Sequence, residues 1–267
     1  MTELGEYKDL AVEISDYVAS VEIQRPPHNF FDVELVRSLG DLFHALDRAP
    51  ACRVIVLSSQ GKNFCAGANL ETKGLESTTS GGAIRGRDGS GHLYQVGARL
   101  FEAETPVVAA IQGAAVGGGL GFALVADFRV ACPEARFTAN FARLGFHHGF
   151  GLTVTLPRLI GEQKAAELLY TGRRVRGEEA FEIGLCDYLV PADELRDKAL
   201  EVADEIAHSA PLAVRSIRRT MRRGLVDRIR IATDRELVEQ DWLRESADFA
   251  EGVKAMGERR LPDFKGR

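Results

Sequence analysis

Two glycine-containing turns are the parts of this sequence best suited to chemistry. They read NFCAGANL (residues 63–70) and AAVGGGLG (residues 114–121), and each follows an apolar run typical of a buried strand. We expect a helix after each turn, with unpaired N–H groups at its start, where the helix dipole favours negative charge. Glycine lets a ligand approach that backbone closely, because it has no β-carbon. Two such turns facing each other would direct two N–H groups at one oxygen, which is an oxyanion hole for an enolate or a tetrahedral anion.

The glycines and histidines of the sequence also allow other interpretations. Glycines in such turns also serve only the close packing of helix on strand. A dinucleotide fingerprint starting at Gly117 would need glycine where the sequence has Phe122, and the chain contains no phosphate-binding P-loop motif and no G-x-S-x-G elbow. The histidines form no HExxH motif, since His147 and His148 are adjacent. We therefore expect no metal site.

Charge and cysteine usage narrow the class of protein. The net charge is −5, which argues against a nucleic-acid or anionic-membrane partner. The N-terminal residues MTELGEYKDL have neither the basic nor the apolar segment of a secretory signal, and no apolar run is long enough to span a bilayer. The cysteines form no CxxC pair and are predicted to be reduced core residues: Cys52, Cys65, Cys132 and Cys186. We expect a cytoplasmic protein.

The elements that would position the turns follow an α/β pattern. Strands are predicted at 11–14, 18–24, 52–59, 106–113 and 128–132, and a helix capped by Asp32 is predicted after the second of them. Further helices are predicted at 93–104 and from the second glycine turn to about 126. This alternation indicates parallel strands joined by right-handed crossovers. Residues 71–92 are polar and carry six glycines, so they are predicted to be either a mobile loop beside the site or a surface insertion.

The C-terminal part is predicted to be almost entirely helical, with helices at 193–208, 211–224 and 226–249. We divide the chain into a core at 1–195 and a helical region at 196–267. Residues 215–230 are rich in arginine. They are interpreted either as an anion site or, preferably, as a solvated helix face with ion pairs at subunit contacts.

The quoted turns resemble the enoyl-CoA hydratase/isomerase family, also called the crotonase family. The resemblance covers nearly the whole chain and rests on PPHNFFD (26–32), AAIQGAAVGGGLGFALVADFRVA (109–131), FARLGFHHGFGLTVTLPRLIG (141–161), ELLYTGRRVRGEEAFEIGLCDYLVP (167–191) and FAEGVKAMGERRLPDFKGR (249–267). It implies an α/β fold built as a spiral of ββα units, with a helical C-terminal trimerisation region. It also implies acyl-CoA thioester substrates, no cofactor beyond the CoA of the substrate, and a homotrimer or a dimer of trimers.

Carried over by position, the resemblance assigns the two oxyanion-hole N–H groups to Ala68 and Gly118. CoA contacts are expected at His28, Ala66, Gly67, Asn69 and Leu70. Asn69 stands where the family usually has aspartate, a change that keeps hydrogen bonding.

The positions of the two hydratase glutamates are the main departure from the family. Gly121 occupies the first and Phe141 the second, and the additional aspartate of the dienoyl isomerases would map to Gly149. Neither glycine nor phenylalanine can activate water or protonate carbon. We expect His147 and His148 to act instead, since imidazole titrates near neutral pH. His92 and Tyr94 are weaker candidates.

Three functions follow. The first is an acyl-CoA enzyme that stabilises an enolate or tetrahedral oxyanion without paired glutamates. The second is a non-catalytic acyl-CoA-binding protein. The third is an enoyl-CoA hydratase with a substitute acid, for which the stretch 71–92 offers Glu71, Glu76 and Asp88.

Overall fold

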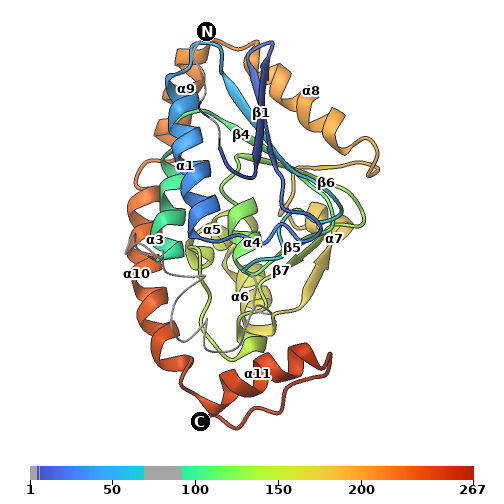
Figure 1. Ribbon diagram of the computed structural model, residues 1–267, viewed down its shortest axis with the longest axis vertical. Helices are drawn as coiled ribbons and strands as arrows, with labels where there is room; N and C mark the ends of the chain where they lie inside the picture. The colour runs from blue at the N-terminus through green and yellow to red at the C-terminus, as the bar shows by residue number, and fades with distance from the viewer. Residues whose placement is uncertain (1–4, 6, 69–91) are drawn as a thin grey trace.

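The computed structural model describes residue 5 and the ranges 7–68 and 92–267 (Figure 1). The strands are β1 (Leu10–Ser15), β2 (Val18–Ile23), β3 (Val54–Ser59), β4 (Val107–Ile111), β5 (Ala114–Val116), β6 (Phe128–Ala131), β7 (Arg136–Thr138), β8 (Arg174–Arg176) and β9 (Tyr188–Leu189). The helices are α1 (Val33–Arg48), α3 (Leu93–Ala98), α4 (Gly118–Ala123), α5 (Leu152–Ile160), α6 (Glu162–Thr171), α7 (Gly177–Glu182), α8 (Leu195–Ala207), α9 (Pro211–Met221), α10 (Leu225–Leu243) and α11 (Ala247–Gly257). Two short 3₁₀ helices are η1 (Arg99–Glu102) and η2 (Ala142–Leu144).

Within the described residues, the larger sheet has the strand order β1-β2-β3-β4-β6-β9. Only β1 pairs antiparallel, and the other pairs are parallel, as the α/β pattern predicted. Side chains alternate between the two faces of β3. Ile55 and Leu57 join the core that contains α1, whereas Val54 and Val56 pack with α8. Helices therefore cover both faces of this sheet (Figure 1).

Local sequence signals explain where α1 begins and how it packs. The Asp32 carboxylate caps the helix by accepting a hydrogen bond from the Leu35 N–H at 2.9 Å, as predicted. Behind it, apolar residues recur at helical spacing and are buried: Val36, Leu39, Phe43 and Leu46. This stripe packs α1 in the same core as Ile55 and Leu57 of the larger sheet. The segment before the helix, residues 28–31, is hydrogen-bonded to the first glycine turn.

Several predicted elements differ from the observed ones. A small second sheet, in the order β5-β7-β8, was not predicted, because its three-residue strands carry too little periodicity. The helix predicted at 93–104 is α-helical only to Ala98 and continues as η1. The helix predicted at 226–249 is in fact two helices, since Ser246 caps a new one by accepting from the Phe249 N–H. The helix expected after the first glycine turn, and residues 71–91 of the polar stretch, lie outside the described residues.

The C-terminal helices share the core of the sheet region. Leu195, Ala199 and Val202 of α8 pack on the larger sheet, and Leu225 and Ile229 of α10 join the main core. The predicted boundary after residue 195 thus does not separate two hydrophobic cores. The prediction that the cysteines are reduced core residues is confirmed, since all four are free and buried.

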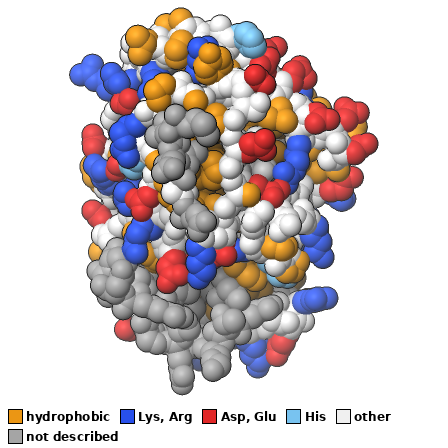
Figure 2. Space-filling model, turned by 45° about the horizontal axis from the view of Figure 1, so that its top comes forward, with side chains coloured by type: hydrophobic (Ala, Val, Ile, Leu, Met, Phe, Trp, Pro, Cys, Tyr) orange, Lys and Arg blue, Asp and Glu red, His pale blue; other side chains and the backbone are white. Residues whose placement is uncertain are grey.

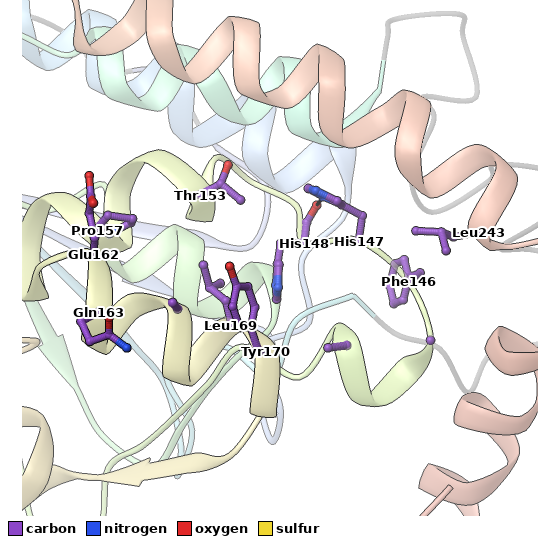
Figure 3. Close-up of a pocket in the computed structure, with 13 residues that line it drawn as sticks. Phe146, His147, His148, Thr153, Pro157, Glu162, Gln163, Leu169, Tyr170 and Leu243 are labelled. Carbon is purple, nitrogen blue, oxygen red and sulfur yellow. Dashed lines mark hydrogen bonds between the residues drawn. The ribbon is translucent and has the colours of Figure 1, made fainter. Parts of the chain in front are cut away.

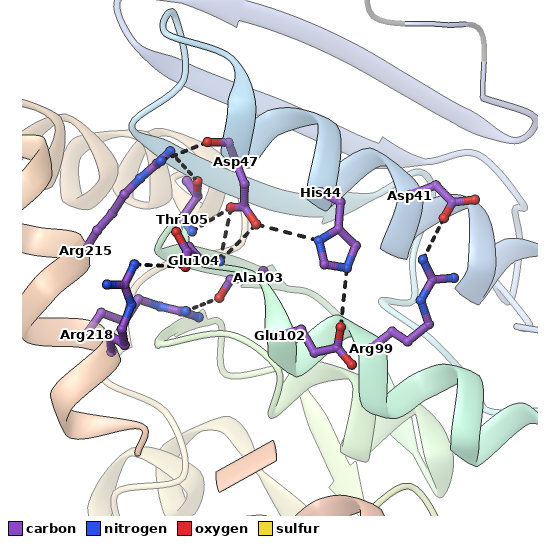
Figure 4. Close-up of polar contacts among 11 residues, drawn as sticks. Asp41, His44, Asp47, Arg99, Glu102, Ala103, Glu104, Thr105, Arg215 and Arg218 are labelled. Carbon is purple, nitrogen blue, oxygen red and sulfur yellow. Dashed lines mark hydrogen bonds and ion pairs between the residues drawn. The ribbon is translucent and has the colours of Figure 1, made fainter. Parts of the chain in front are cut away.

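The arginine-rich segment is solvated only in part, since Arg215, Arg218 and Arg222 bind other groups of their own chain. The expected solvated face is confirmed at the exposed arginines of the segment: Arg219, Arg223, Arg228 and Arg230. Arg215 donates to the Asp47 carbonyl at 2.8 Å and to the Thr105 hydroxyl at 3.0 Å (Figure 4). Arg218 is buried and pairs with Asp127 at 2.8 Å, where Arg222 joins it at 3.1 Å. Asp127 also accepts from the Val107 N–H, so it is structural, as predicted.

The visible surface carries mixed charge. Acidic and basic side chains are interspersed over the face shown in Figure 2. No helix in the described part of the chain combines the length and apolar composition that crossing a membrane requires.

Candidate active site

The two glycine turns lie side by side. The Cys65 N–H donates to the Ala114 carbonyl at 2.9 Å, and the Val116 N–H donates to the Cys65 carbonyl at 3.0 Å. Gly67 has a φ of +90°, and a β-carbon on it would lie 2.9 Å from the Val116 oxygen. Glycine is needed at this position both for its backbone angle and for the close approach of the second turn.

Hydrogen bonds from neighbouring segments hold both turns in place. Gly117, with a φ of +57°, donates its N–H to the Thr138 carbonyl of β7 at 2.8 Å, and α4 starts at the next residue. On the other side, the Phe31 N–H donates to the Gly67 carbonyl at 3.1 Å. The unpredicted small sheet therefore positions the second turn, and residues 28–31 position the first.

A cavity of about 180 Å³ opens between the turns. Its walls include the backbone of both turns, at Gly67, Ala68, Gly117 and Gly118, together with Ala66. Aromatic side chains provide most of the remaining wall: Phe30, Phe31, Tyr94, Phe141, Phe146 and Phe249. Among the described residues that line it, none is a carboxylate or a histidine, and the one charged side chain is Arg244. An anion formed here would meet backbone N–H groups in mainly apolar surroundings.

Aromatic rings occupy the space beside the three positions expected to carry family carboxylates. A β-carbon on Gly121 would lie 2.7 Å from the β-carbon of Phe150, which is buried. A β-carbon on Gly149 would overlap the ring of Tyr94. Phe141 is buried with its ring 5.3 Å from that of Phe146. Aromatic side chains thus fill the space beside Gly121 and Gly149 and leave no room there for a longer side chain.

The histidine pair lines a different cavity, of about 720 Å³ (Figure 3). Its described walls include Thr153 and Tyr170 but none of the glycine-turn residues. His147 Nδ1 lies 2.9 Å from the His148 carbonyl oxygen, so that nitrogen donates its proton there. Burial, followed by the charge of His147, lowers the pKa of His148 to about 4. The structure does not place these histidines in the described wall of the cavity between the turns, although Phe146 lines both cavities. The ring of Phe141, in the wall of that cavity, lies 5.4 Å from the His148 ring.

Two polar residues of α10, not singled out from the sequence, hold the histidine loop. Gln240 Nε2 donates to the His147 carbonyl at 2.7 Å and lies 3.3 Å from the Tyr94 hydroxyl. The Glu236 carboxylate accepts from the Gly151 N–H at 3.0 Å, and its burial raises the pKa to about 7. The sequence offered little signal, because both residues lie on a helix with mostly polar composition and a weak apolar stripe.

Two further predicted residues, His28 and His92, contact backbone groups. His28 is exposed, and its carbonyl accepts from the Ala66 N–H at 3.0 Å. His92 is buried and caps α3, its Nδ1 accepting from the Tyr94 N–H at 3.2 Å. Asn69 and Leu70 lie outside the described residues, as do the acids of 71–91. No cluster of metal-ligating side chains occurs among the residues that the structure describes.

Comparison with known proteins decides the family. The family described as enoyl-CoA hydratase/isomerase matches residues 13–267. The chain belongs to this family. Carnitinyl-CoA dehydratase of Proteus mirabilis is 33% identical over 257 residues, covering 94% of this chain and 95% of that protein. (E)-Benzylidenesuccinyl-CoA hydratase of Thauera aromatica is 34% identical over 259 residues, covering 96% and 99%.

A solved structure of the enoyl-CoA hydratase/isomerase family, from Pseudoalteromonas atlantica, superposes with a TM-score of 0.85 at 29% identity. It covers 97% of this chain and 100% of that one. The α/β crotonase fold, with mixed sheets and C-terminal helices, is therefore confirmed. The chain is an enzyme of the enoyl-CoA hydratase/isomerase family, which acts on acyl-CoA thioesters.

Proposed function

We propose that this enzyme binds an acyl-CoA thioester with its carbonyl oxygen on the N–H groups of Ala68 and Gly118, and stabilises an enolate or tetrahedral oxyanion there. The observation that carries the proposal is the hydrogen-bonded adjacency of the two turns at one cavity. Preorganised backbone donors in apolar surroundings stabilise a developing negative charge far more than donors in water do. His28, Ala66, Gly67, Asn69 and Leu70 are proposed to contact the CoA portion.

We further propose that the reaction proceeds without the paired glutamates of hydratases, with Gly121 and Phe141 in their positions. The aromatic packing at Phe150 and Phe141 supports this, since neither position has kept space or polarity for a carboxylate. Isomerisation, carbon–carbon bond hydrolysis, thioester hydrolysis and decarboxylation are reactions that an oxyanion hole can assist. His147 and His148 are retained as proposed proton carriers. They line the neighbouring cavity, which shares Phe146 with the cavity of the turns.

A hydratase with a substitute acid is the second candidate, favoured by the names of the relatives. Both curated relatives described above are a hydratase or a dehydratase of CoA thioesters. A third candidate, acyl-CoA binding without chemistry, is favoured by the lack of carboxylate or histidine in the described cavity wall.

The oxyanion hole is tested by infrared spectroscopy of a thioester labelled with ¹³C at the carbonyl. Hydrogen bonds from both N–H groups should shift the carbonyl stretch of the bound thioester to lower wavenumber. The variant pair Phe31→Ala/Gly118→Ala and Phe31→Ala/Gly118→Pro isolates the Gly118 donor. Both give the new β-carbon the space of the Phe31 ring, and only proline removes the N–H. The shift should persist with alanine and shrink with proline, and an equal shift in both would contradict the assignment.

We also propose that the C-terminal helices carry the contacts of a homotrimer or a dimer of trimers. Large apolar side chains are exposed on α9 and α10, among them Leu212 at 83%, Met221 at 72% and Ile231 at 71%. Such a surface is typical of subunit contacts. Light scattering on the purified protein tests the proposal, which a monomer at micromolar concentration would contradict.

A further inference from the structure

Tyr94 carries the only neutral, proton-releasing side chain in the described wall of the cavity between the glycine turns. The other polar side chains of that wall are the amide of Asn140 and the guanidinium of Arg244, which stays protonated. Tyr94 lies on α3 and is 5% exposed. A buried phenol both donates and accepts hydrogen bonds, so its partners decide what it can offer a ligand.

The amide of Gln240 determines which of these two roles the Tyr94 hydroxyl already fills. Gln240 Nε2 donates to the His147 carbonyl at 2.7 Å, and a carbonyl can only accept. Gln240 Oε1 accepts from Arg244 at 2.8 Å, and a guanidinium can only donate. The orientation of the amide is therefore fixed at both ends, and it is Nε2 that lies 3.3 Å from the Tyr94 oxygen. The hydroxyl thus accepts from Gln240 and keeps its own proton for another partner.

The hydroxyl is also held in a fixed position. In the described part of the chain its one hydrogen bond is the contact with Gln240, which is itself fully buried. The ring of Tyr94 packs edge-to-face with those of His92 and Phe150, whose centres lie 4.9 Å and 6.4 Å away. Little side-chain entropy is therefore lost when a ligand meets this donor. Burial raises the pKa of Tyr94 to about 12, so at neutral pH the hydroxyl is protonated and can donate.

The backbone donors of the turns belong to the same cavity as Tyr94. Its described wall contains Ala68 and Gly118, and its volume of about 180 Å³ corresponds to roughly six water molecules in the liquid. A short acyl group bound at the turns fills such a space. A β-carbon on Gly149 would lie 2.4 Å from the Tyr94 oxygen, so glycine at that position leaves the hydroxyl its place.

We propose that the Tyr94 hydroxyl is a third hydrogen-bond donor of the active site and stabilises negative charge that spreads from the thioester oxygen onto the acyl group. This inference rests on the proposed binding of the thioester at the glycine turns. A donor held in apolar surroundings before the charge develops stabilises that charge strongly. The substrates that gain most are acyl-CoA thioesters with a second oxygen on the acyl group, over which the charge of an enolate is shared.

Acetoacetyl-CoA tests this inference, because its enolate shares the charge between the thioester oxygen and a second oxygen on the acyl group. The enolate absorbs in the ultraviolet, so a pH titration, after subtraction of the ligand-free protein, gives the midpoint at which half of the bound ligand is ionised. Binding by the wild type should lower this midpoint below that of free acetoacetyl-CoA. Tyr94→Phe removes only the hydroxyl and should raise the bound midpoint by about one pH unit, a tenfold loss of preference for the enolate.

Two controls separate the hydroxyl from the fold. Tyr94→Phe should bind butyryl-CoA, which lacks the second oxygen, within about twofold of the wild-type affinity, and this binding shows that the variant is folded. Tyr17→Phe removes a hydroxyl from a side chain that is 48% exposed between β1 and β2, and should keep the wild-type midpoint.

The outcomes distinguish this inference from the proposed function. Equal midpoints for the wild type and Tyr94→Phe, both below that of free acetoacetyl-CoA, would overturn the inference and leave the proposed function standing. If the wild type did not bind acetoacetyl-CoA, or bound it without lowering the midpoint, the proposed oxyanion hole would fall, and this inference with it.

Discussion

The ring of Phe31 fills the space that a side chain on Gly118 would need. Phe31 is buried, and its own N–H is bonded to the carbonyl of Gly67 in the other turn. One residue therefore connects the two turns through its backbone and closes over the second through its side chain. This contact requires glycine at position 118, in addition to the access that glycine gives a ligand to the backbone.

The contact predicts coupling between the two positions. Gly118→Ala alone should lower the free energy of unfolding by about 2 kcal/mol, because the methyl group forces the ring aside. In a Phe31→Leu background the same change should cost less than half as much, since the smaller side chain leaves room. Urea unfolding of the four proteins measures the coupling. Additive costs would show that the ring does not restrict position 118.

Restoring a glutamate at position 121 should not restore a hydratase. Gly121→Glu must displace Phe150. We therefore expect the free energy of unfolding to fall by about 2 kcal/mol or more, as in other overpacked cores. Adding Phe150→Ala to Gly121→Glu should restore part of the lost stability only if the glutamate occupies the space that the Phe150 ring leaves. Thermal unfolding gives the stabilities. A stable Gly121→Glu single variant that hydrates an enoyl-CoA would contradict the packing argument.

Asp127 should contribute strongly to stability. Asp127→Ala leaves Arg218 and Arg222 without their carboxylate and the Val107 N–H without its acceptor. We predict that the free energy of unfolding falls by about 3 kcal/mol, as it does when one partner of other buried ion pairs is removed. Glu104→Ala serves as the control, because its pair with Arg219 is exposed and should cost less than about 0.5 kcal/mol. Similar losses for both variants, measured by urea unfolding, would refute the distinction.

Glu236 should make the protein less stable as the pH rises. Its pKa is about 7 in the folded protein against an ordinary 4.5, so folding favours the protonated form. The contribution of Glu236 to the free energy of unfolding is at its maximum below pH 4.5. It falls by about 3 kcal/mol as the pH rises through 7. Glu236→Gln should therefore equal the wild type near pH 5 and exceed it in stability at pH 8.

Comparison of Glu236→Gln with the wild type at each pH cancels the titration of His148. The lowered pKa of that histidine works in the opposite direction, and its share of the stability is lost as the pH falls from 6.5 through about 4. A wild type that stays more stable than Glu236→Gln at pH 8 would show that the carboxylate form is well accommodated.

The histidine assignment makes a separate prediction. The double variant His147→Ala/His148→Ala should lose turnover of any thioester that the wild type converts, while still binding that thioester. His44→Ala, on α1 beside Glu102, is the control and should retain activity. Unchanged turnover in the double variant, followed by mass spectrometry, would remove both histidines from the mechanism.

Local signals in the sequence predicted the elements that hold the site. The apolar run of β3, the cap at Asp32 and the two glycine turns are each encoded within a few residues, so their type and place followed directly. The adjacency of the turns was only a condition of the predicted oxyanion hole, because the hydrogen bonds that join them run between Cys65 and the unpredicted strand β5.

The cavity wall could not be predicted in the same way. Phe150 and Tyr94 reach Gly121 and Gly149 from distant parts of the chain, and Arg244 comes from the last third. The histidines illustrate the limit, since a loop next to the site in sequence turns its side chains into another cavity. Tertiary packing alone decides such orientations.

The most direct test of the central claim is incubation of the purified enzyme with short trans-2-enoyl-CoA thioesters, with products identified by mass. We predict that the thioester is bound at the glycine turns and gains no water, because we propose that Gly121 and Phe141 stand in place of the paired glutamates that would activate it. A gain of one water at a rate far above the uncatalysed one would contradict the account and direct attention to the acids of residues 71–91.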